Sequence, residues 1–324
     1  MLAVSLLESA TLKIGLQISS FTWPGGDAAI GETLARICRA ADDAGFDSIW
    51  VMDHLFQIRS VGDVEEPMLE GTTALGFMAA HTSRARLGLM VGAVPYRWPG
   101  VWIKSVTTLD VLSGGRAWFG IGAAWNVEES RSLGVPFPDL PDRFALLTDT
   151  LQMTHLAFTG ERGSEAPFVG RRVRAGRLLN SPQALSRPRI PIMVGGGGER
   201  TTLRLVARYA DACNVFGGPD MLRHKFSVLQ EHCADVGRDY AEIERTNLST
   251  ISITADGRKG SLTPASLVER LGNWAEAGAH HTIFAVRGVS DVSKLTLIGR
   301  DVIPQVRSLG EPSPLDSTAS PQPP

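Results

Sequence analysis

The sequence predicts an α/β protein, a (β/α)8 TIM barrel with an insertion before its fifth strand. Eight apolar or β-branched runs of strand length alternate with amphipathic helical stretches along the 324 residues. Strict alternation predicts a parallel sheet, and eight such units are typical of a closed barrel. No G-x-G-x-x-G motif follows the first run, which disfavours the competing open, doubly wound sheet.

Each predicted element follows from a local pattern. Helical stretches such as residues 30–45 and 201–212 repeat apolar residues three and four positions apart, and Gly45 and Gly278 are typical helix stops. The predicted strands, in chain order, are residues 12–19, 47–52, 86–94, 116–122, 190–196, 210–216, 249–255 and 281–286.

The chain divides into one domain with two flanking segments. We expect residues 1–11 to be an amino-terminal extension and residues 12–309 to form the barrel. Residues 160–189 are too many for an ordinary helix-to-strand connection, and we interpret them as an insertion that serves as a lid. Residues 310–324 contain five prolines and few apolar residues, so a disordered tail is expected.

Composition excludes several classes of function. The 32 basic and 34 acidic side chains nearly balance, so nucleic acid is not an expected partner. No signal peptide and no run of roughly 18 apolar residues is present, which predicts a cytoplasmic protein with no membrane partner. The three cysteines form no C-x-x-C pair and the histidines show no ligand spacing, so no metal is expected.

Polar residues at the end of the second predicted strand are the first candidates for a site. Asp53 and His54 directly follow an apolar run, and active sites of such barrels lie at the carboxyl ends of the strands. A surface turn explains one such pair equally well. After the third strand, Gly92 lets the backbone pass close to a planar ligand, and after the fourth, Trp125 and Asn126 supply an apolar face and an amide; ordinary packing is the alternative for each.

Four consecutive glycines are the strongest single signal. They separate the fifth strand from a helix that begins near Thr201. Backbone amides without side chains at a helix amino terminus form an anion cradle, to which Arg200 and the Thr201 hydroxyl can add; a flexible loop is the alternative. The four are Gly195, Gly196, Gly197 and Gly198.

The ordered set of motifs resembles a known family. The segments KIGLQIS, WVMDH, RLGLMVG, FGIGAAWN and PIMVGGGGERTTLRL are similar to the luciferase-like monooxygenase superfamily, and within it to the branch that uses the deazaflavin coenzyme F420. The resemblance covers residues 13–309. It implies a barrel that binds a flavin-like ring in its mouth, usually as a homodimer.

The same resemblance assigns roles to individual residues. Asp53 matches a cofactor-contacting acid and His54 an active-site histidine. Met90 and Val91 match a bulge, often a non-prolyl cis peptide, that backs the ring, and the glycine run matches a phosphate-binding turn. Similar sugar-phosphate dehydrogenases carry a catalytic glutamate where this chain has Trp125, with Glu128 and Glu129 only a few residues on, which puts that reaction in doubt.

The expected function is therefore an F420-dependent oxidoreductase that transfers a hydride between the deazaflavin and a small organic substrate. His54 would hydrogen-bond to or protonate the substrate heteroatom. Two alternatives stay open: an FMN-dependent luciferase-like monooxygenase, and a non-catalytic deazaflavin-binding protein. The sequence does not identify the substrate or the direction of transfer.

Overall fold

Nine strand segments form one parallel sheet in the computed structural model, which describes residues 11–308. Their order in the sheet is β3-β2-β1-β13-β12-β11-β10-β5-β4. The segments are β1 (Lys13–Ile18), β2 (Ser48–Val51), β3 (Arg86–Leu89), β4 (Gly92–Ala93), β5 (Phe119–Gly122), β10 (Ile192–Gly195), β11 (Ala212–Phe216), β12 (Glu244–Ile251) and β13 (His281–Val286).

The sheet closes on itself between β3 and β5. Leu87 bridges Ala117 in parallel, and its amide donates to the carbonyl of Arg116 at 2.8 Å. β4 pairs with β5 through Gly92 and Ile121. Because β3 and β4 together occupy the third predicted strand, the segments make eight barrel strands, and the predicted (β/α)8 barrel is confirmed.

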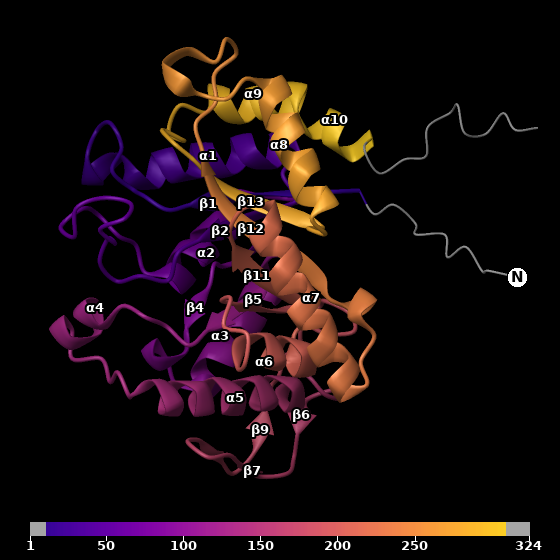
Figure 1. Cartoon of the computed structure of the whole chain (residues 1–324). Helices are drawn as coiled ribbons and strands as arrows, with labels where there is room; N and C mark the ends of the chain where they lie inside the picture. Colours follow the sequence, from indigo (N-terminus) through magenta and orange to yellow (C-terminus); the bar gives the residue numbers. More distant parts are fainter. Residues whose placement is uncertain (1–10, 309–324) are drawn as a thin grey trace, which may run out of the picture.

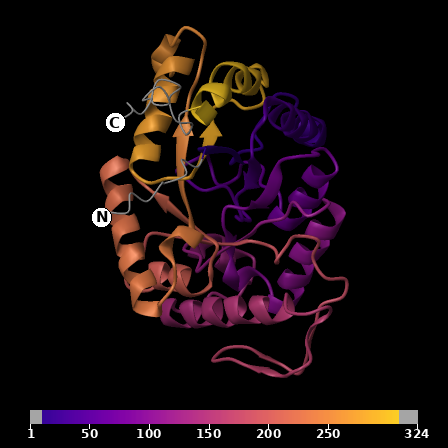
Figure 2. The ribbon, with the colours of Figure 1, turned by 90° about the vertical axis from the view of Figure 1, so that its right-hand side faces the viewer.

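Helices surround the strands on the outside, as Figures 1 and 2 show. Their apolar faces cover the sheet, because parallel strands are buried on both sides. The helices are α1 (Ile30–Ala44), α2 (Gly71–Ala79), α3 (Pro99–Leu112), α4 (Val127–Ser132), α5 (Leu140–Ala157), α6 (Thr202–Tyr209), α7 (Pro219–Val236), α8 (Pro264–Glu276), α9 (Ser293–Asp301) and α10 (Ile303–Ser308). Single 3-10 turns are η1 (Asp27–Ala29), η2 (Val94–Tyr96), η3 (Tyr240–Glu242) and η4 (Arg258–Gly260).

The core has an outer and an inner part. The larger cluster lies between sheet and helices. The smaller lies inside the barrel, since its side chains come from different strands around the ring: Trp50, Met90, Trp118, Met193, Ala212 and Ile283. The rings of Trp50 and Trp118 are 5.9 Å apart between centroids, so large side chains fill the barrel interior.

Two strands, β5 and β12, begin or end three or more residues away from their predicted bounds. β12 begins at Glu244 and ends at Ile251, whereas the pattern predicted residues 249–255. The first half of β12 is polar and was not recognised as strand, while Ile253 makes only an isolated bridge with Leu262. β5 begins at Phe119 rather than Arg116, with a single bridge at Ala117 before it.

The predicted insertion, residues 160–189, forms two small antiparallel pairs: β6 (Gly163–Ser164) with β9 (Leu178–Leu179), and β7 (Phe168–Val169) with β8 (Arg174–Ala175). The buried carboxylate of Asp149 on α5 accepts the backbone amides of Arg171, Arg172 and Val173 at 3.1, 2.5 and 2.9 Å. Figures 1 and 2 both show the insertion on the outer side of α5. Its service as a lid stays a prediction.

The two predicted flanking segments fall almost wholly outside the described residues. Of the extension, residues 1–11, the structure describes residue 11 alone, and it describes none of the predicted disordered tail, residues 310–324.

Candidate functional site

The candidate site lies where β2, β4, β5 and β10 reach their carboxyl ends. β2 ends at Val51, and Asp53 and His54 follow it closely in the chain. We call this end of the barrel the carboxyl mouth. The two neighbouring side chains, Asp53 and His54, have different partners there.

Asp53 belongs to a buried ion pair. Its carboxylate accepts Nη1 and Nη2 of Arg97 at 2.6 and 2.7 Å, and the amide of Ala93 at 2.7 Å. The side chain is 1% exposed. A carboxylate with a two-pronged arginine contact has a fixed position. Asp53 therefore connects the end of β2 to β4, and a direct contact with a cofactor stays a prediction.

Arg97 has a second carboxylate partner. Its Nη2 also donates to Glu70, the residue that caps α2 by accepting the amides of Thr72 at 3.2 Å and Thr73 at 2.7 Å. Burial raises the pKa of Glu70, but the hydrogen bonds from Arg97 and Thr73 outweigh it and lower this pKa to about 2. Asp53, Arg97 and Glu70 thus form one charged network that joins strand ends to α2.

His54 pairs with a buried carboxylate. Its Nδ1 lies 2.7 Å from Oε1 of Glu129, a side chain that is 0% exposed. The other carboxylate oxygen of Glu129 accepts the amides of Leu55 and Phe56 at 2.5 and 3.1 Å. Glu129 therefore fixes both the imidazole and the backbone that follows it.

The charge on Glu129 determines which imidazole nitrogen carries hydrogen. Burial opposes ionisation, but hydrogen bonds from His54 and Tyr96 lower the pKa of Glu129 below its usual range. Tyr96 donates its hydroxyl to Oε1 at 2.5 Å, and burial together with this bond raises the pKa of Tyr96. An ionised carboxylate only accepts hydrogen bonds, so Nδ1 of His54 donates. Within residues 11–308, Nε2 of His54 has no hydrogen-bond partner.

Trp125 and Asn126 are at the same mouth but differ in role. The ring of Trp125 meets that of His54 edge to face, with centroids 5.5 Å apart, and this tryptophan is 66% exposed. Asn126 caps α4, since its side-chain oxygen accepts the amide of Glu128 at 3.1 Å. An exposed indole beside a histidine is an apolar surface that a planar ligand can cover.

The peptide bond between Met90 and Val91 is cis, the geometry that the resemblance implied. The Met90 side chain lies in the inner core, and Val91 lies between β5 and β10. A Cβ at Gly122 or Gly195 would come within 2.9 or 2.7 Å of the Val91 side chain, so packing already accounts for these two glycines.

Gly92 also has a packing role. A Cβ built there would come within 2.1 Å of the Trp102 ring, so the close approach of that indole requires glycine. Contact of Gly92 with a ligand stays a prediction.

The rest of the glycine run leaves free backbone donors. Gly196 has a φ of +123° and donates its amide to the carbonyl of Asn214 at 3.0 Å. The amides of Gly197 and Gly198 have no acceptor in the part of the chain that the structure describes. They lie next to the start of α6, where the helix dipole also favours an anion.

Charged and polar side chains surround this loop. Arg200 and Thr201 are exposed, and Thr201 makes no side-chain cap bond to α6. Lys225 pairs with Glu199 at 2.5 Å and lies near Gly197, where a built Cβ would be 3.6 Å from its Cε. Free amides with a nearby ammonium group suit a phosphate, so the residues present fit the cofactor phosphate that the resemblance implied.

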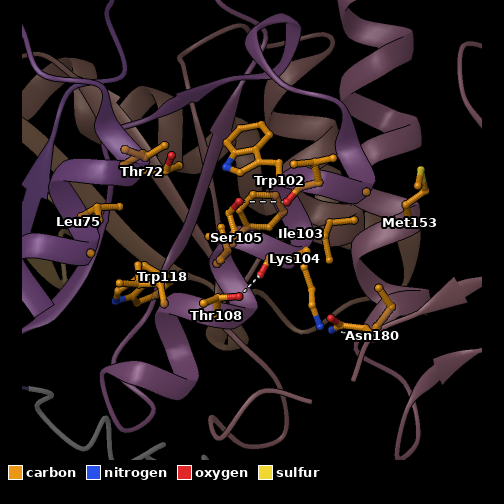
Figure 3. A pocket seen from close by; sticks show the side chains of 18 of the residues that line it. Thr72, Leu75, Trp102, Ile103, Lys104, Ser105, Thr108, Trp118, Met153 and Asn180 are labelled. Atoms are coloured by element: carbon orange, nitrogen blue, oxygen red, sulfur yellow. Dashed lines mark hydrogen bonds between the residues drawn. The ribbon is translucent and has the colours of Figure 1, made fainter. Parts of the chain in front are cut away.

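One cavity of the protein lies away from the carboxyl mouth. It measures about 720 Å³ and is formed by α2, α3, α5 and the insertion, without His54 or the glycine run. Figure 3 shows Trp102, Ser105 and Thr108 of α3 opposite Thr72 and Leu75 of α2, with Asn180 at the edge. Exposed apolar side chains of α3 line it: Val101 and Leu112 are 64% and 76% exposed.

Other kinds of site have less support. Among residues 11–308 no group of three or more His, Cys, Asp or Glu side chains could hold a metal ion. Cys38, Cys213 and Cys233 are buried free thiols. Every helix that the structure describes is too short or too polar to cross a membrane.

Sequence reasoning assigned no role to four residues of the site, although it noted Glu129 a few positions after Trp125. Glu129 and Tyr96 hold His54, and Arg97 and Glu70 hold Asp53. Only Glu129 left a signal, because it lies three residues after Asn126, at the start of the helix that Asn126 caps. The other three are recognised only from the fold.

The comparisons with known proteins agree on one family. A family model described as luciferase-like monooxygenase matches residues 12–259. The F420-dependent glucose-6-phosphate dehydrogenase of Kineococcus radiotolerans is 30% identical over 270 residues, covering 82% of this chain and 73% of that protein. The enzyme of the same name from Nakamurella multipartita is 25% identical and covers 85% of this chain and 93% of its own.

Solved structures share the fold at low sequence identity. The coenzyme F420-dependent tetrahydromethanopterin reductase of Methanopyrus kandleri has a TM-score of 0.74 at 17% identity, covering 92% of this chain and 100% of that one. An F420-dependent secondary alcohol dehydrogenase has a TM-score of 0.74 at 16% identity, covering 90% and 99%. With the family model matching most of the chain, the protein belongs to the luciferase-like monooxygenase family and is an oxidoreductase.

Proposed function

We propose that the protein transfers a hydride between coenzyme F420 and a small polar organic substrate, with His54 binding or protonating the substrate heteroatom. The observation that carries this proposal is the Glu129–His54 pair. Glu129 holds Nδ1 at 2.7 Å and leaves Nε2 without a protein partner at the carboxyl mouth. A histidine oriented by a carboxylate is suited to proton transfer near neutral pH.

The deazaflavin is the proposed cofactor because the two relatives described above are named as F420-dependent and the glycine loop suits a phosphate. When bound, it would supply or accept the hydride. The chain's own contribution is positioning. Amides of Gly197 and Gly198 would hold the phosphate, and the exposed ring of Trp125 would cover part of an apolar ring system.

A small cavity at the same mouth suits a polar substrate. It measures about 270 Å³ and lies at the carboxyl ends of β1, β12 and β13. Its polar lining has hydroxyl groups from six residues together with Gln17 and Arg287, and His54 lies outside this lining; the hydroxyl groups come from Ser19, Ser20, Thr22, Ser60, Thr250 and Ser290. Hydroxyl groups both donate and accept hydrogen bonds, so an alcohol, a ketone or a sugar fits this lining.

An FMN-dependent monooxygenase is the second candidate. The FMN complex of 3,6-diketocamphane monooxygenase from Pseudomonas putida has a TM-score of 0.70 at 16% identity. Separate titrations of purified protein with F420 and FMN distinguish the two candidates. We expect tighter binding of F420, and preferential binding of FMN would overturn the cofactor assignment.

Replacement of His54 tests the catalytic role. We expect His54→Ala to lower turnover by about 10²-fold or more, the usual contribution of a general acid or base, with unchanged F420 affinity. His54→Asn should retain part of the activity by hydrogen bonding. Deazaflavin absorbance with a panel of small alcohols, ketones and sugar phosphates measures turnover. Near-normal turnover of His54→Ala on an accepted substrate would remove His54 from the mechanism.

We also propose a homodimer formed through the outer faces of α2 and α3. Val101 and Leu112 of α3 line the cavity of Figure 3, Phe77 of α2 is 39% exposed, and Lys104 is the charged residue of α3 that lines the cavity. A nearly uncharged apolar face can pack against the same face of a second subunit. A two-fold symmetric interface requires such self-complementarity.

Molar mass in solution tests the dimer. Light scattering should give twice the chain mass, and Val101→Glu combined with Leu112→Glu should give one chain mass. Leu133→Glu is the matched control, since Leu133 is 52% exposed and follows α4. A monomeric parent protein would contradict the proposal.

A further inference from the structure

A separate cavity of about 390 Å³ lies at the opposite end of the barrel. Lys13, Arg86, Glu244 and His281 line it, and each is the first residue of a barrel strand. Because all barrel strands are parallel, their first residues gather at the end away from His54. We call this end the amino mouth.

The carboxylates of this cavity already have cation partners. His281 donates Nδ1–H to the ionised carboxylate of Glu244, with Nδ1 and Oε1 2.8 Å apart. Asp47 pairs with Arg307 at 3.3 Å and Glu244 with Lys13 at 2.7 Å, and both carboxylate oxygens of Asp211 accept from Arg189. Negative charge in the wall is therefore neutralised within the protein.

Arg86 makes no ion pair within residues 11–308, although the charges of Asp110 and Glu244 act on it. Its Nη2 makes two long hydrogen bonds, at 3.4 Å each, to the carbonyl of Gly115 and the hydroxyl of Ser186. Its Nε is buried with no hydrogen-bond partner, and its guanidinium lies 5.6 Å from the centre of the Trp118 ring. A buried donor without an acceptor is destabilising, so this guanidinium is suited to receive an acceptor from a ligand.

Arg187 is the second cation without a carboxylate. Its Nη1 donates to the carbonyls of Ala184 and Ser186 at 2.6 and 3.1 Å, and no acidic side chain pairs with it within residues 11–308. Arg187 lines the same cavity as Arg86. Two guanidinium groups thus give one wall an excess of positive charge.

The floor of the cavity needs no ligand. His281 connects Glu244 to Ser48, whose hydroxyl is 2.9 Å from Nε2 and also accepts Nε1 of Trp50 at 2.6 Å. Although a serine, a histidine and a glutamate are in line, Ser48 is 1% exposed and its oxygen is occupied. These hydrogen bonds among Ser48, His281 and Glu244 therefore have a structural role. The groups of the cavity that have no carboxylate partner within residues 11–308 are the guanidinium groups of Arg86 and Arg187.

We propose that the amino mouth is a second ligand site that binds a compact oxyanion, a phosphate or a carboxylate group, through Arg86 and Arg187. Guanidinium groups bind both oxyanions through paired N–H donors, and the cavity is within the usual size of small-molecule sites. The aromatic ring of Trp118 fixes the plane of Arg86 next to the anion.

Calorimetric titration of the full chain with inorganic phosphate, and separately with malonate, tests this site at constant ionic strength. We expect saturable binding of at least one anion, and the preferred anion identifies the ligand class. Arg187→Gln should weaken binding about tenfold or more, the usual effect of losing a charged hydrogen bond. Arg187 is exposed, so this variant should fold; Arg86→Gln should weaken binding further, with its melting curve checked.

Two further variants separate this site from other anion binding. Arg258→Gln is the matched control, since Arg258 has a 72% exposed side chain and lies outside the cavity, and it should bind as the parent does. Gly197→Ala changes the cradle at the carboxyl mouth and should also leave this binding unchanged. Absence of saturable binding, or binding lost in Gly197→Ala and kept in Arg187→Gln, would overturn the proposal.

Discussion

The two mouths of the barrel hold their charged groups differently. At the carboxyl mouth the carboxylates of Asp53 and Glu129 are 1% and 0% exposed, and several donors bind each one. At the amino mouth the partners are partly exposed, as for Lys13 at 50% and Asp211 at 30%. Buried networks fix the side chains around the proposed active site, whereas the other mouth combines the buried His281–Glu244 pair with partly exposed ion pairs and with two arginines that have no carboxylate partner within residues 11–308.

The largest expected loss of unfolding free energy follows from breaking the buried Asp53–Arg97 pair. Asp53→Ala leaves Arg97 buried with Glu70 as its remaining carboxylate, and loss of one partner from such a pair costs about 3–5 kcal/mol of unfolding free energy. Lys13→Ala at the amino mouth removes a half-exposed partner and should cost about 1 kcal/mol or less. Urea unfolding measures both. Equal losses would show that burial does not distinguish the two mouths.

Acid unfolding gives a second test of the difference between the two mouths, and its expected effect on stability is smaller than that of Asp53→Ala. Burial raises the pKa of Glu244, but its hydrogen bond with His281 and the charges of His281 and Lys13 lower this pKa from 4.5 to about 2. Because the folded pKa is the lower one, the stabilisation is present above pH 4.5 and is lost as pH falls toward 2, by up to about 3 kcal/mol.

Glu244→Gln should therefore lose less stability than the parent chain between pH 4.5 and 2, measured by urea unfolding at each pH. Glu70 at the carboxyl mouth also has a pKa of about 2, so part of the acid dependence should persist in this variant. A variant with the full acid dependence of the parent would mean that Glu244 does not stabilise the amino mouth.

The strand pattern was visible in the sequence because most of the parallel strands are apolar and are followed within three residues by a glycine or a polar residue. His54 and the glycine run were predictable for that reason, as residues that follow β2 and β10. Strand bounds failed where polar residues enter a strand, as at Glu244. Thr246 and Asn247 of β12 are buried although they are polar, so hydropathy alone does not identify this half of the strand.

The partners of the site residues were not predictable from local pattern. Glu129 is 75 residues from His54 in the chain, and Arg97 is 44 residues from Asp53. Such pairs depend on how β2, β4 and β5 align in the barrel, which no short motif encodes. The packing role of Gly92 against the Trp102 ring was likewise visible only in the structure, and its contact with a ligand stays a prediction.

The smallest expected change in stability is in the glycine run. There, one glycine is needed for folding and another would bind the ligand. Gly196 has a φ of +123°, so Gly196→Ala strains the backbone and should cost about 1–3 kcal/mol of stability. Gly197 has an ordinary φ, and its added Cβ would touch only Cε of Lys225 at 3.6 Å. Gly197→Ala should therefore change the unfolding free energy by about 0.5 kcal/mol or less.

The same Gly197→Ala change should weaken F420 binding about tenfold, because the new methyl group occupies space beside the amides that would hold the phosphate. Fluorescence titration measures this affinity. Gly31→Ala is the matched control, since an added Cβ on α1 has no atom within 4 Å, and it should bind F420 as the parent does. If Gly197→Ala kept full affinity in a folded protein, the phosphate would lie elsewhere at the carboxyl mouth, and the free amides of Gly197 and Gly198 would have no part in binding it.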